Sequence, residues 1–306
     1  MFETVFTQVV VLFILIFIGF ILNKTKVLND KSIKGITDIV LYIATPAVII
    51  KSFFREFSPA LLKNLGIGFI SGVVAHIIFI TLSILLLRCR DTSKNKVLQF
   101  SVIFSNCGYM SIPLLQAVLG NDGVFYGATY IAVFQIMIWS YGIFLIGDGF
   151  KSITAKKVIL SPGIIGFAIA FIIFVLQIPI PTIIREPISY MASLNTPLPM
   201  IVIGYHLANS NILNGLKNIS VLWATVIKLG LFPLVAIFGF YIFGIRGTMP
   251  LAVTTCISAP TAAICTMFCS KFERDTSLSV TMVSFTTLLS VISMPLIASL
   301  AEKFIS

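Results

Sequence analysis

The stretch SNCGYMSIP (residues 105–113) brings Asn, Gly, Ser and Pro together inside a run of otherwise apolar residues. A helix in hydrocarbon has to keep its peptide groups hydrogen-bonded, because each unpaired N–H or C=O costs on the order of several kcal/mol. Pro113 removes a backbone donor, and Gly108 makes unwinding easier. The side chains of Asn106 and Ser111 can bond to the backbone groups that are freed. We therefore predict a helix that is interrupted near the middle of a membrane span.

The composition of the whole chain is that of a membrane protein. Of its 306 residues, 58% are hydrophobic and only 10% are charged, whereas about a quarter of the residues in soluble domains are charged. The hydrophobic residues form runs of about 20, the length an α-helix needs to cross about 30 Å of hydrocarbon. We expect a multi-pass protein of the cell membrane, with the lipid bilayer as a partner. The first run is expected to be a retained span and not a signal peptide.

Ten such runs follow one another, separated by short polar connections that leave no room for a soluble domain. The predicted spans are residues 5–22, 36–54, 65–87, 98–119, 124–147, 160–178, 187–208, 219–243, 249–270 and 277–301. The expected fold is an all-α polytopic membrane protein with ten transmembrane helices.

The Lys and Arg residues are divided unevenly between the two sides of the membrane. Fourteen of the 21 lie in the connections that follow the odd-numbered spans, six lie on the other side, and Lys228 lies within a span. Because cytoplasmic loops carry the excess of Lys and Arg, both termini are expected to face away from the cytoplasm. Topology therefore accounts for the net charge of +10 without a nucleic-acid partner.

A faint internal repeat relates the two halves of the chain. A Thr-Pro pair at 45–46 in the second span returns 151 residues later at 196–197 in the seventh, and a proline in the fourth span returns 147 residues later in the ninth. Each half, residues 1–150 and 151–306, then holds five spans. An odd number of spans makes the halves point in opposite directions, which is the inverted-repeat plan of many secondary transporters.

The ninth span contains a second polar interruption, TCISAPTAAICT (residues 255–266), with Ser258, Ala259, Pro260 and Thr261 near its middle. Matching breaks in two inverted halves should meet near the centre of the bilayer. The half-helix that begins after a break presents unpaired N–H groups and a partial charge of roughly +0.5. Two such ends facing one cavity form an anion site. At the first break, this site would also include Cys107 and Tyr109.

Five pieces of the chain, in this order and spacing, carry a family resemblance. They are SNCGYMSIPLLQAVLG (105–120), TPLPMIVIGYHLA (196–208), KLGLFP (228–233), SAPTAA (258–263) and FERDTSLSVTMVSFTTLLSVISMPL (272–296). The chain resembles the auxin efflux carrier family, whose bacterial members include malate and malonate permease-like proteins. The resemblance implies an inverted five-plus-five repeat with a scaffold part and a transport part, in which broken helices 4 and 9 cross. It also implies carriage of organic anions.

Three features depart from the plant branch of that family. The sequence has Ser161 and Pro162 where Asn-Pro is expected, and Cys265 where a second proline usually stands in the ninth span. The long central hydrophilic loop that is frequent in plant members is absent from this sequence. These differences argue against auxin as the substrate.

Lys228 lies near the centre of the eighth span. A lysine at this depth costs about 2.5–3.5 kcal/mol on insertion scales, so it should face protein or water. Two interpretations stay open: a counter-charge for an anionic substrate, or a structural donor to helix-end carbonyls freed around Pro233.

For other polar residues in the predicted spans, the sequence gives weaker evidence of a functional role. Asn195 and Thr196 are expected to line the cavity from the seventh span. His76 and His206 are either proton relays or neutral hydrogen-bonding residues. Gln135 is either a substrate ligand or a contact that joins two helices.

The sequence favours neither a metal nor a cofactor. Five cysteines show no paired spacing, no His or acidic residue accompanies them, and we expect them to pack as small apolar groups. Neither histidine has a carboxylate within the membrane or a metal-binding spacing beside it, so an enzyme is not expected. No Asp or Glu lies at the centre of a span, which argues against Na⁺ or H⁺ coupling through an acid.

The expected function is a secondary transporter that moves small organic anions by alternating access, a dicarboxylate such as malate being the best candidate. Spans 3–5 and 8–10 would form the transport part, and spans 1, 2, 6 and 7 the scaffold. The alternatives are an anion channel or ligand sensor on the same fold, or a cation-coupled symporter of a different organic acid. The sequence leaves a homodimer open.

Overall fold

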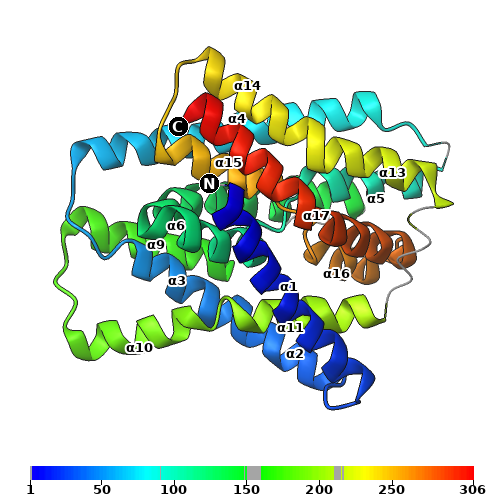
Figure 1. Cartoon of the computed structure of the whole chain (residues 1–306), viewed down its shortest axis with the longest axis horizontal. Helices are drawn as coiled ribbons and strands as arrows, with labels where there is room; N and C mark the ends of the chain where they lie inside the picture. The colour runs from blue at the N-terminus through cyan, green and yellow to red at the C-terminus, as the bar shows by residue number, and fades with distance from the viewer. Residues whose placement is uncertain (1, 90, 148, 150–159, 210–214, 216) are drawn as a thin grey trace.

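The computed structural model describes every residue except 1, 90, 148, 150–159, 210–214 and 216 (Figure 1). The described residues form helices, and their one β-type pairing is an isolated bridge. Six helical segments are long and apolar enough to cross a membrane, and two shorter apolar helices accompany them in the described part of the chain. The prediction of an all-α protein with long apolar spans is confirmed at this level.

The helices of the first half begin and end close to the predicted spans. They are α1 (Phe2–Lys24), α2 (Asp30–Ile39), the π-helical turn η1 (Val40–Ala44), α3 (Thr45–Ser52), α4 (Pro59–Leu86), α5 (Thr92–Ile103), η2 (Cys107–Ser111), α6 (Ile112–Met137), η3 (Ile138–Gly142) and α7 (Ile143–Ile146). Within α6 the backbone of Gly120 has φ 62° and ψ −153°, a conformation that favours glycine. This kink lies between the predicted fourth and fifth spans.

The second half is also a series of helical segments, most of them short. They are α9 (Pro162–Leu176), α10 (Thr182–Ser193), α11 (Pro197–Ala208), α13 (Ile219–Val226), η5 (Ile227–Leu231), α14 (Phe232–Ile242), α15 (Thr248–Ser258), α16 (Ile264–Lys271) and α17 (Thr276–Ile305). The predicted boundary between the halves, at residues 150 and 151, lies outside the described residues.

Side-chain caps begin four of the helices. Asn29 caps α2, Asp91 caps α5, Asn218 caps α13 and Asp275 caps α17, each by accepting from backbone N–H groups of the first turn. All four lie in connections that follow odd-numbered predicted spans, which are the connections with most of the Lys and Arg. In Figure 1 the α1–α2 and α16–α17 connections lie toward the right, and the α3–α4 and α9–α10 connections lie at the left.

The helices gather into two groups (Figure 1). In one group α1 packs on α11, α11 on α2, and α3 on both α9 and α10. In the other, α15 packs on α6, α14 and α17, and α4 packs on α5 and α6. Contacts of α1 with α6 and α17, and of α3 and α9 with α6, join the groups.

Two glycines bring α1 and α11 into close contact. A Cβ atom on Gly19 would overlap the backbone of Ile201, and one on Gly204 would overlap the carbonyl of Ile16. Small residues that let helix backbones approach are typical of packing within membranes, where water does not drive helices together.

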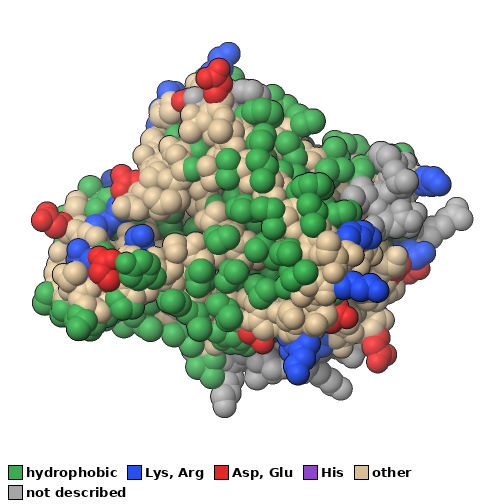
Figure 2. Space-filling view, turned by 60° about the horizontal axis from the view of Figure 1, so that its bottom comes forward, with side chains coloured by type: hydrophobic (Ala, Val, Ile, Leu, Met, Phe, Trp, Pro, Cys, Tyr) green, Lys and Arg blue, Asp and Glu red, His purple; other side chains and the backbone are tan. Residues whose placement is uncertain are grey.

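The surface matches a lipid environment. Figure 2 shows hydrophobic side chains spread across the middle of one face, with charged side chains gathered toward its edges. The exposed hydrophobic residues include Phe17 on α1, Ile70 on α4, Phe238 on α14 and Ile292 on α17, each at least 60% exposed. Such an apolar girdle over several helices is what acyl chains cover.

Candidate functional site

Each polar interruption predicted from sequence contains a short non-helical stretch, residues 104–106 and residues 259–263, and the two stretches pair with each other. Gly108 and Pro113, which were expected to interrupt the first helix, lie within the helical η2 and α6. The backbone is extended at Phe104 after α5 and at Ala259 after α15. The Asn106 N–H donates to the Pro260 carbonyl at 2.7 Å, and the Ala262 N–H donates to the Phe104 carbonyl at 2.9 Å. These bonds flank an antiparallel bridge between residues 105 and 261. Each break therefore provides hydrogen-bond partners for some of the backbone N–H and C=O groups that the other break leaves unpaired.

Two hydroxyl groups, those of Ser105 and Thr261, complete the pairing. Each one caps the end of the helix that leads into the other break. In an uninterrupted helix the Ser101 carbonyl would accept from the N–H of Ser105, and the Ile257 carbonyl from that of Thr261. Here the Thr261 hydroxyl donates to the Ser101 carbonyl at 2.9 Å, and the Ser105 hydroxyl donates to the Ile257 carbonyl at 3.1 Å. Each break thus supplies a donor that the other helix end lacks.

Lys228 reaches this pairing from η5. Its side chain is fully buried, and its ammonium Nζ donates to the Ser105 hydroxyl and, at 3.3 Å, to the Ile257 carbonyl. The structural interpretation placed its acceptors near Pro233; the carbonyl it bonds belongs to the last turn of α15 instead. A cation is favoured there by the negative end of the helix dipole.

Asn106 offers an unused donor at the start of the half-helix formed by η2 and the first part of α6. Its side chain is 5% exposed, and its Nδ2 has no hydrogen-bond partner among the described residues. The first N–H groups of a helix also have no partner within the helix. Because an unpaired buried amide is costly, it marks a place where a ligand oxygen can bind.

At the second break, backbone N–H groups form hydrogen bonds within the protein. The Thr261 N–H donates to the Thr286 hydroxyl at 3.1 Å, and the N–H groups of Cys265 and Thr266 bond back to Ala262 and Ala263. The sequence predicted an equivalent helix end at each break. Among the described side chains, the unpaired buried amide, that of Asn106, lies at the first of the two breaks.

Asn195 connects the first break to the prolines of spans 2 and 7. Its Oδ1 accepts from the Thr45 hydroxyl at 2.9 Å, and its Nδ2 donates to the Gly108 carbonyl at 3.4 Å. Thr196 next to it is half-buried and precedes α11. The structure therefore places Asn195 in contact with Gly108, two residues after Asn106.

The remaining predicted site residues are buried or half-buried, and two of them bond to the same carbonyl of α15. The Ser111 and Ser258 hydroxyls both donate to the Thr255 carbonyl, at 3.2 and 2.9 Å. Cys107, Pro113, Ala259 and Pro260 are buried, and Tyr109 packs half-buried against the α1–α11 contact region.

The two histidines lie in different surroundings. The imidazole of His76 is buried, with Nδ1 2.8 Å from the Gly72 carbonyl, its ring centre 5.2 Å from that of Tyr130, and Nε2 without a partner among described groups. His206 lies in the last turn of α11, beside Tyr205, whose hydroxyl donates to Asp30 at 2.7 Å. That position is at the α1–α2 connection, away from the breaks.

Sequence reasoning missed Ser105, Ser101, Thr286 and Tyr130 as parts of the site. Gln135, in contrast, packs against Gly163 of α9 and accepts from Trp139, as a contact between helices would. The signal that would have found the missed residues is the pair of hydroxyls, Ser105 and Thr261, placed next to the two interruptions.

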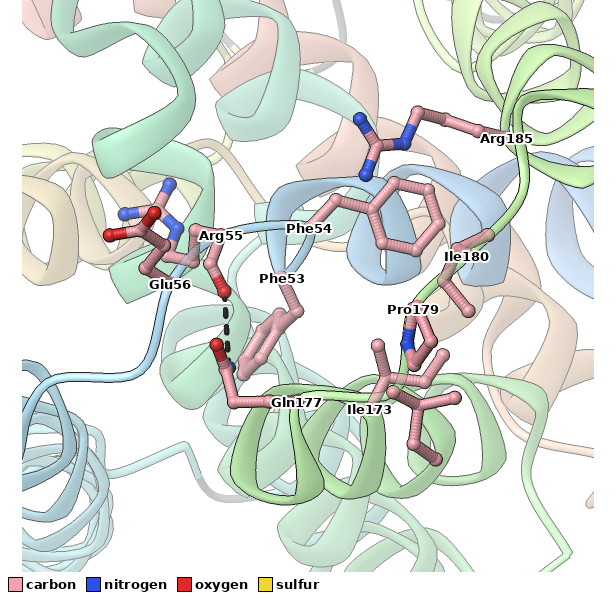
Figure 3. A pocket seen from close by; sticks show the side chains of 10 residues that line it. Phe53, Phe54, Arg55, Glu56, Ile173, Gln177, Pro179, Ile180 and Arg185 are labelled. Atoms are coloured by element: carbon pink, nitrogen blue, oxygen red, sulfur yellow. Dashed lines mark hydrogen bonds between the residues drawn. The ribbon is translucent and has the colours of Figure 1, made fainter.

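A pocket at the end of the molecule where α3 and α9 end is separate from the breaks (Figure 3). Phe53, Arg55 and Gln177 line it, and the Gln177 amide donates to the Arg55 carbonyl at 3.3 Å. The Arg55 guanidinium lies 4.1 Å from the Phe125 ring centre and bonds to Asp122 at 2.7 Å. None of the predicted site residues lines this pocket.

Comparison with known proteins agrees with a membrane carrier. A family model described as "Membrane transport protein" matches residues 4–298. An uncharacterized transporter of Methanothermobacter thermautotrophicus is 23% identical over 294 residues, covering 92% of this chain and 94% of that protein. An uncharacterized transporter of Methanocaldococcus jannaschii is 24% identical over 301 residues, covering 93% and 94% of the two chains.

Proposed function

The chain belongs to the membrane transport protein family, and from that premise we propose that it is a secondary transporter of small organic anions, with a dicarboxylate such as malate as substrate. It is a multi-pass membrane protein of a transporter family and not an enzyme. The finer resemblance, to the malate and malonate permease-like branch of the auxin efflux carriers, supports the choice of substrate class.

The observation that carries the proposal is the junction of the two breaks. A buried ammonium, that of Lys228, lies on one side of Ser105, and the unpaired amide of Asn106 follows Ser105 in the chain. Positive charge, an unused N–H donor and the start of a helix at one place favour an oxyanion. No Asp or Glu of the described residues forms an ion pair with Lys228.

In the proposed mechanism, one carboxylate of the substrate accepts from the Asn106 amide and from N–H groups of the first turn of η2, near Gly108. The amide of Asn195 orients that turn through the Gly108 carbonyl. Burying the carboxylate without such donors would cost several kcal/mol, so the donors select anions over neutral solutes.

Transport by alternating access follows if the two groups of helices move against each other. We propose α1, α2, α3, α9, α10 and α11 as the scaffold, and α4 to α7 with α13 to α17 as the transport part. In this scheme the chain has ten spans in two inverted halves, with both termini away from the cytoplasm. The Arg55–Asp122 pair joins the α3–α4 connection to the kinked α6, across the proposed boundary.

Asn106→Ala tests the proposal. Losing a hydrogen bond to a charged group costs about 1.5–3 kcal/mol, so carboxylate affinity should fall about 10- to 150-fold. Thermal shift of the purified protein with a carboxylate panel reports binding, and labelled malate counterflow in proteoliposomes reports transport. Asn64→Ala, on α4 and outside the site, is the matched control.

Counterflow also separates the alternatives. A carrier accelerates exchange when substrate is present on both sides of the membrane, whereas a channel does not. A carboxylate that shifts the melting temperature of the protein but is not transported into proteoliposomes would indicate a ligand sensor. Wild-type transport by a folded Asn106→Ala protein would remove Asn106 from the site.

A further inference from the structure

Lys228 is a buried titratable residue, and no carboxylate of the described residues pairs with it. Its side chain has no exposed surface, and its two acceptors, the Ser105 hydroxyl and the Ile257 carbonyl, are both neutral. The ion pair between Arg55 and Asp122 joins the α3–α4 connection to α6 and does not include Lys228. An isolated ammonium in such a place is so costly that it either loses its proton or takes an anion as its partner.

The titratable groups around Lys228 and Ser105 do not supply that anion. They are Cys107 on η2, His76 on α4, Tyr130 on α6 and Cys256 on α15. Thiols, phenols and imidazoles are not anions in their usual state at pH 7. On α5, α14 and α17 the titratable residues lie in terminal turns, at Lys94, Lys96, Tyr241, Glu302 and Lys303, and α13 has none.

Both protonation states of Lys228 fit the observed contacts. A neutral amine still holds two N–H groups, which is the number of hydrogen bonds that Nζ makes. The junction therefore does not need to rearrange when the proton leaves. His76 Nε2 and the Tyr130 hydroxyl, both buried and unpartnered among the described groups, are proton-accepting and proton-donating groups in the same cluster.

We propose that Lys228 binds a proton together with the transported anion and releases both on the other side, so that the protein is a proton–anion symporter. This inference rests on the proposed function. On the open face the amine lone pair takes a proton from water and forms an N–H bond, and the ammonium balances one carboxylate. On the opposite face the same N–H bond breaks, the proton returns to water, and the empty carrier goes back with a neutral amine.

The experiment uses purified full-length protein in proteoliposomes with trapped pyranine, a pH-sensitive dye, and labelled malate as the probe. Valinomycin and equal potassium on both sides hold the membrane potential at zero. At pH 7 to 8 outside, malate addition should acidify the lumen. A gradient of about one pH unit, acidic outside, should drive up to about tenfold malate accumulation.

Three variants test whether Lys228 is the residue that binds the transported proton. Lys228→Arg stays protonated, because a guanidinium does not release its proton in proteins. Because it keeps the positive charge, it should still bind malate in thermal shift and carry out a slower counterflow, but it should lose gradient-driven accumulation and the dye signal. Lys228→Met should lose malate binding in thermal shift by more than about tenfold. Lys63→Met, an exposed lysine on α4, should behave as wild type.

The outcomes distinguish the two proposals. Malate counterflow without luminal acidification or gradient-driven accumulation would overturn proton coupling and leave the carrier intact. Acidification that persists in Lys228→Arg would show that the substrate brings its own proton, and would also overturn the role of Lys228. No malate binding or counterflow at all would overturn the dicarboxylate assignment and the coupling scheme with it.

Discussion

Thr45 and Asn195 are 150 positions apart in the chain, and the hydroxyl of Thr45 donates a hydrogen bond to Oδ1 of Asn195 at 2.9 Å. Thr45 precedes Pro46 in the second predicted span, and Asn195 stands two residues before Pro197 in the seventh. The same Asn195 holds the Gly108 carbonyl with its amide. The side chain of Asn195 thus connects the predicted second and seventh spans, which both contain proline, to the first break through two hydrogen bonds.

Loss of this tie should affect both stability and transport. Thr45→Val keeps the shape but removes the donor, and hydrogen bonds between membrane helices are worth about 0.6 kcal/mol on average and up to about 1.7. We expect a lower melting temperature in detergent and malate counterflow several-fold below wild type.

Thr45→Ser is the matched control, because it keeps the hydroxyl and should transport normally. Asn195→Leu should be worse than Thr45→Val, since it also frees the Gly108 carbonyl. If Thr45→Val and Thr45→Ser unfold at the same temperature, the bond does not contribute to stability.

The reciprocal caps of the two breaks yield a second prediction. Thr261→Val leaves the Ser101 carbonyl without its donor inside the protein. An unsatisfied buried acceptor costs about 1–3 kcal/mol, and the cost should appear as a lower melting temperature. Thr261→Ser retains the cap and should melt close to wild type. Equal stability of the two variants would show that water or another group replaces the threonine hydroxyl.

The sequence predicted an all-α protein with long apolar helices because that signal is local. A hydrophobic run of about 20 residues can be recognised one segment at a time, and six described helical segments are long and apolar enough to cross a membrane. The neighbourhood of each interruption was also visible locally. Pro260 lies in the second break, but Gly108 and Pro113 lie in the helix that follows the first break, residues 104–106.

The contacts between the breaks were not predictable in the same way. Nothing in the sequence says that the Ser105 hydroxyl caps α15 while that of Thr261 caps α5, because each partner lies about 150 residues away. The acceptor of Lys228 was misplaced for the same reason: Pro233 is close in sequence, but Ile257 is close in space. The packing of the helices in three dimensions determines which residues form these hydrogen bonds.

Close packing of α1 on α11 makes Gly204 sensitive to substitution. A Cβ atom there would overlap the carbonyl of Ile16, which belongs to backbone and cannot turn aside. We expect Gly204→Ala to separate the two helices and to cost about 1–3 kcal/mol, the usual range for overpacking.

Gly239→Ala on α14 is the control for helix propensity, because a Cβ there meets nothing within 4 Å. It should be neutral or slightly stabilising, since alanine favours a helix over glycine. Thermal unfolding in detergent compares the pair. A Gly204→Ala protein as stable as Gly239→Ala would contradict the close approach of α1 and α11.

The orientation of the chain in the membrane can be tested at two exposed lysines. Lys303 in the last turn of α17 should face away from the cytoplasm, and Lys31 at the start of α2 should face the cytoplasm, where most of the Lys and Arg lie. Lys303→Cys and Lys31→Cys are made in a Cys89→Ser background, since the other four cysteines are buried. In intact cells a membrane-impermeant maleimide should label Lys303→Cys and not Lys31→Cys, and both should be labelled after the cells are opened. The reverse pattern would invert the topology and place both termini in the cytoplasm.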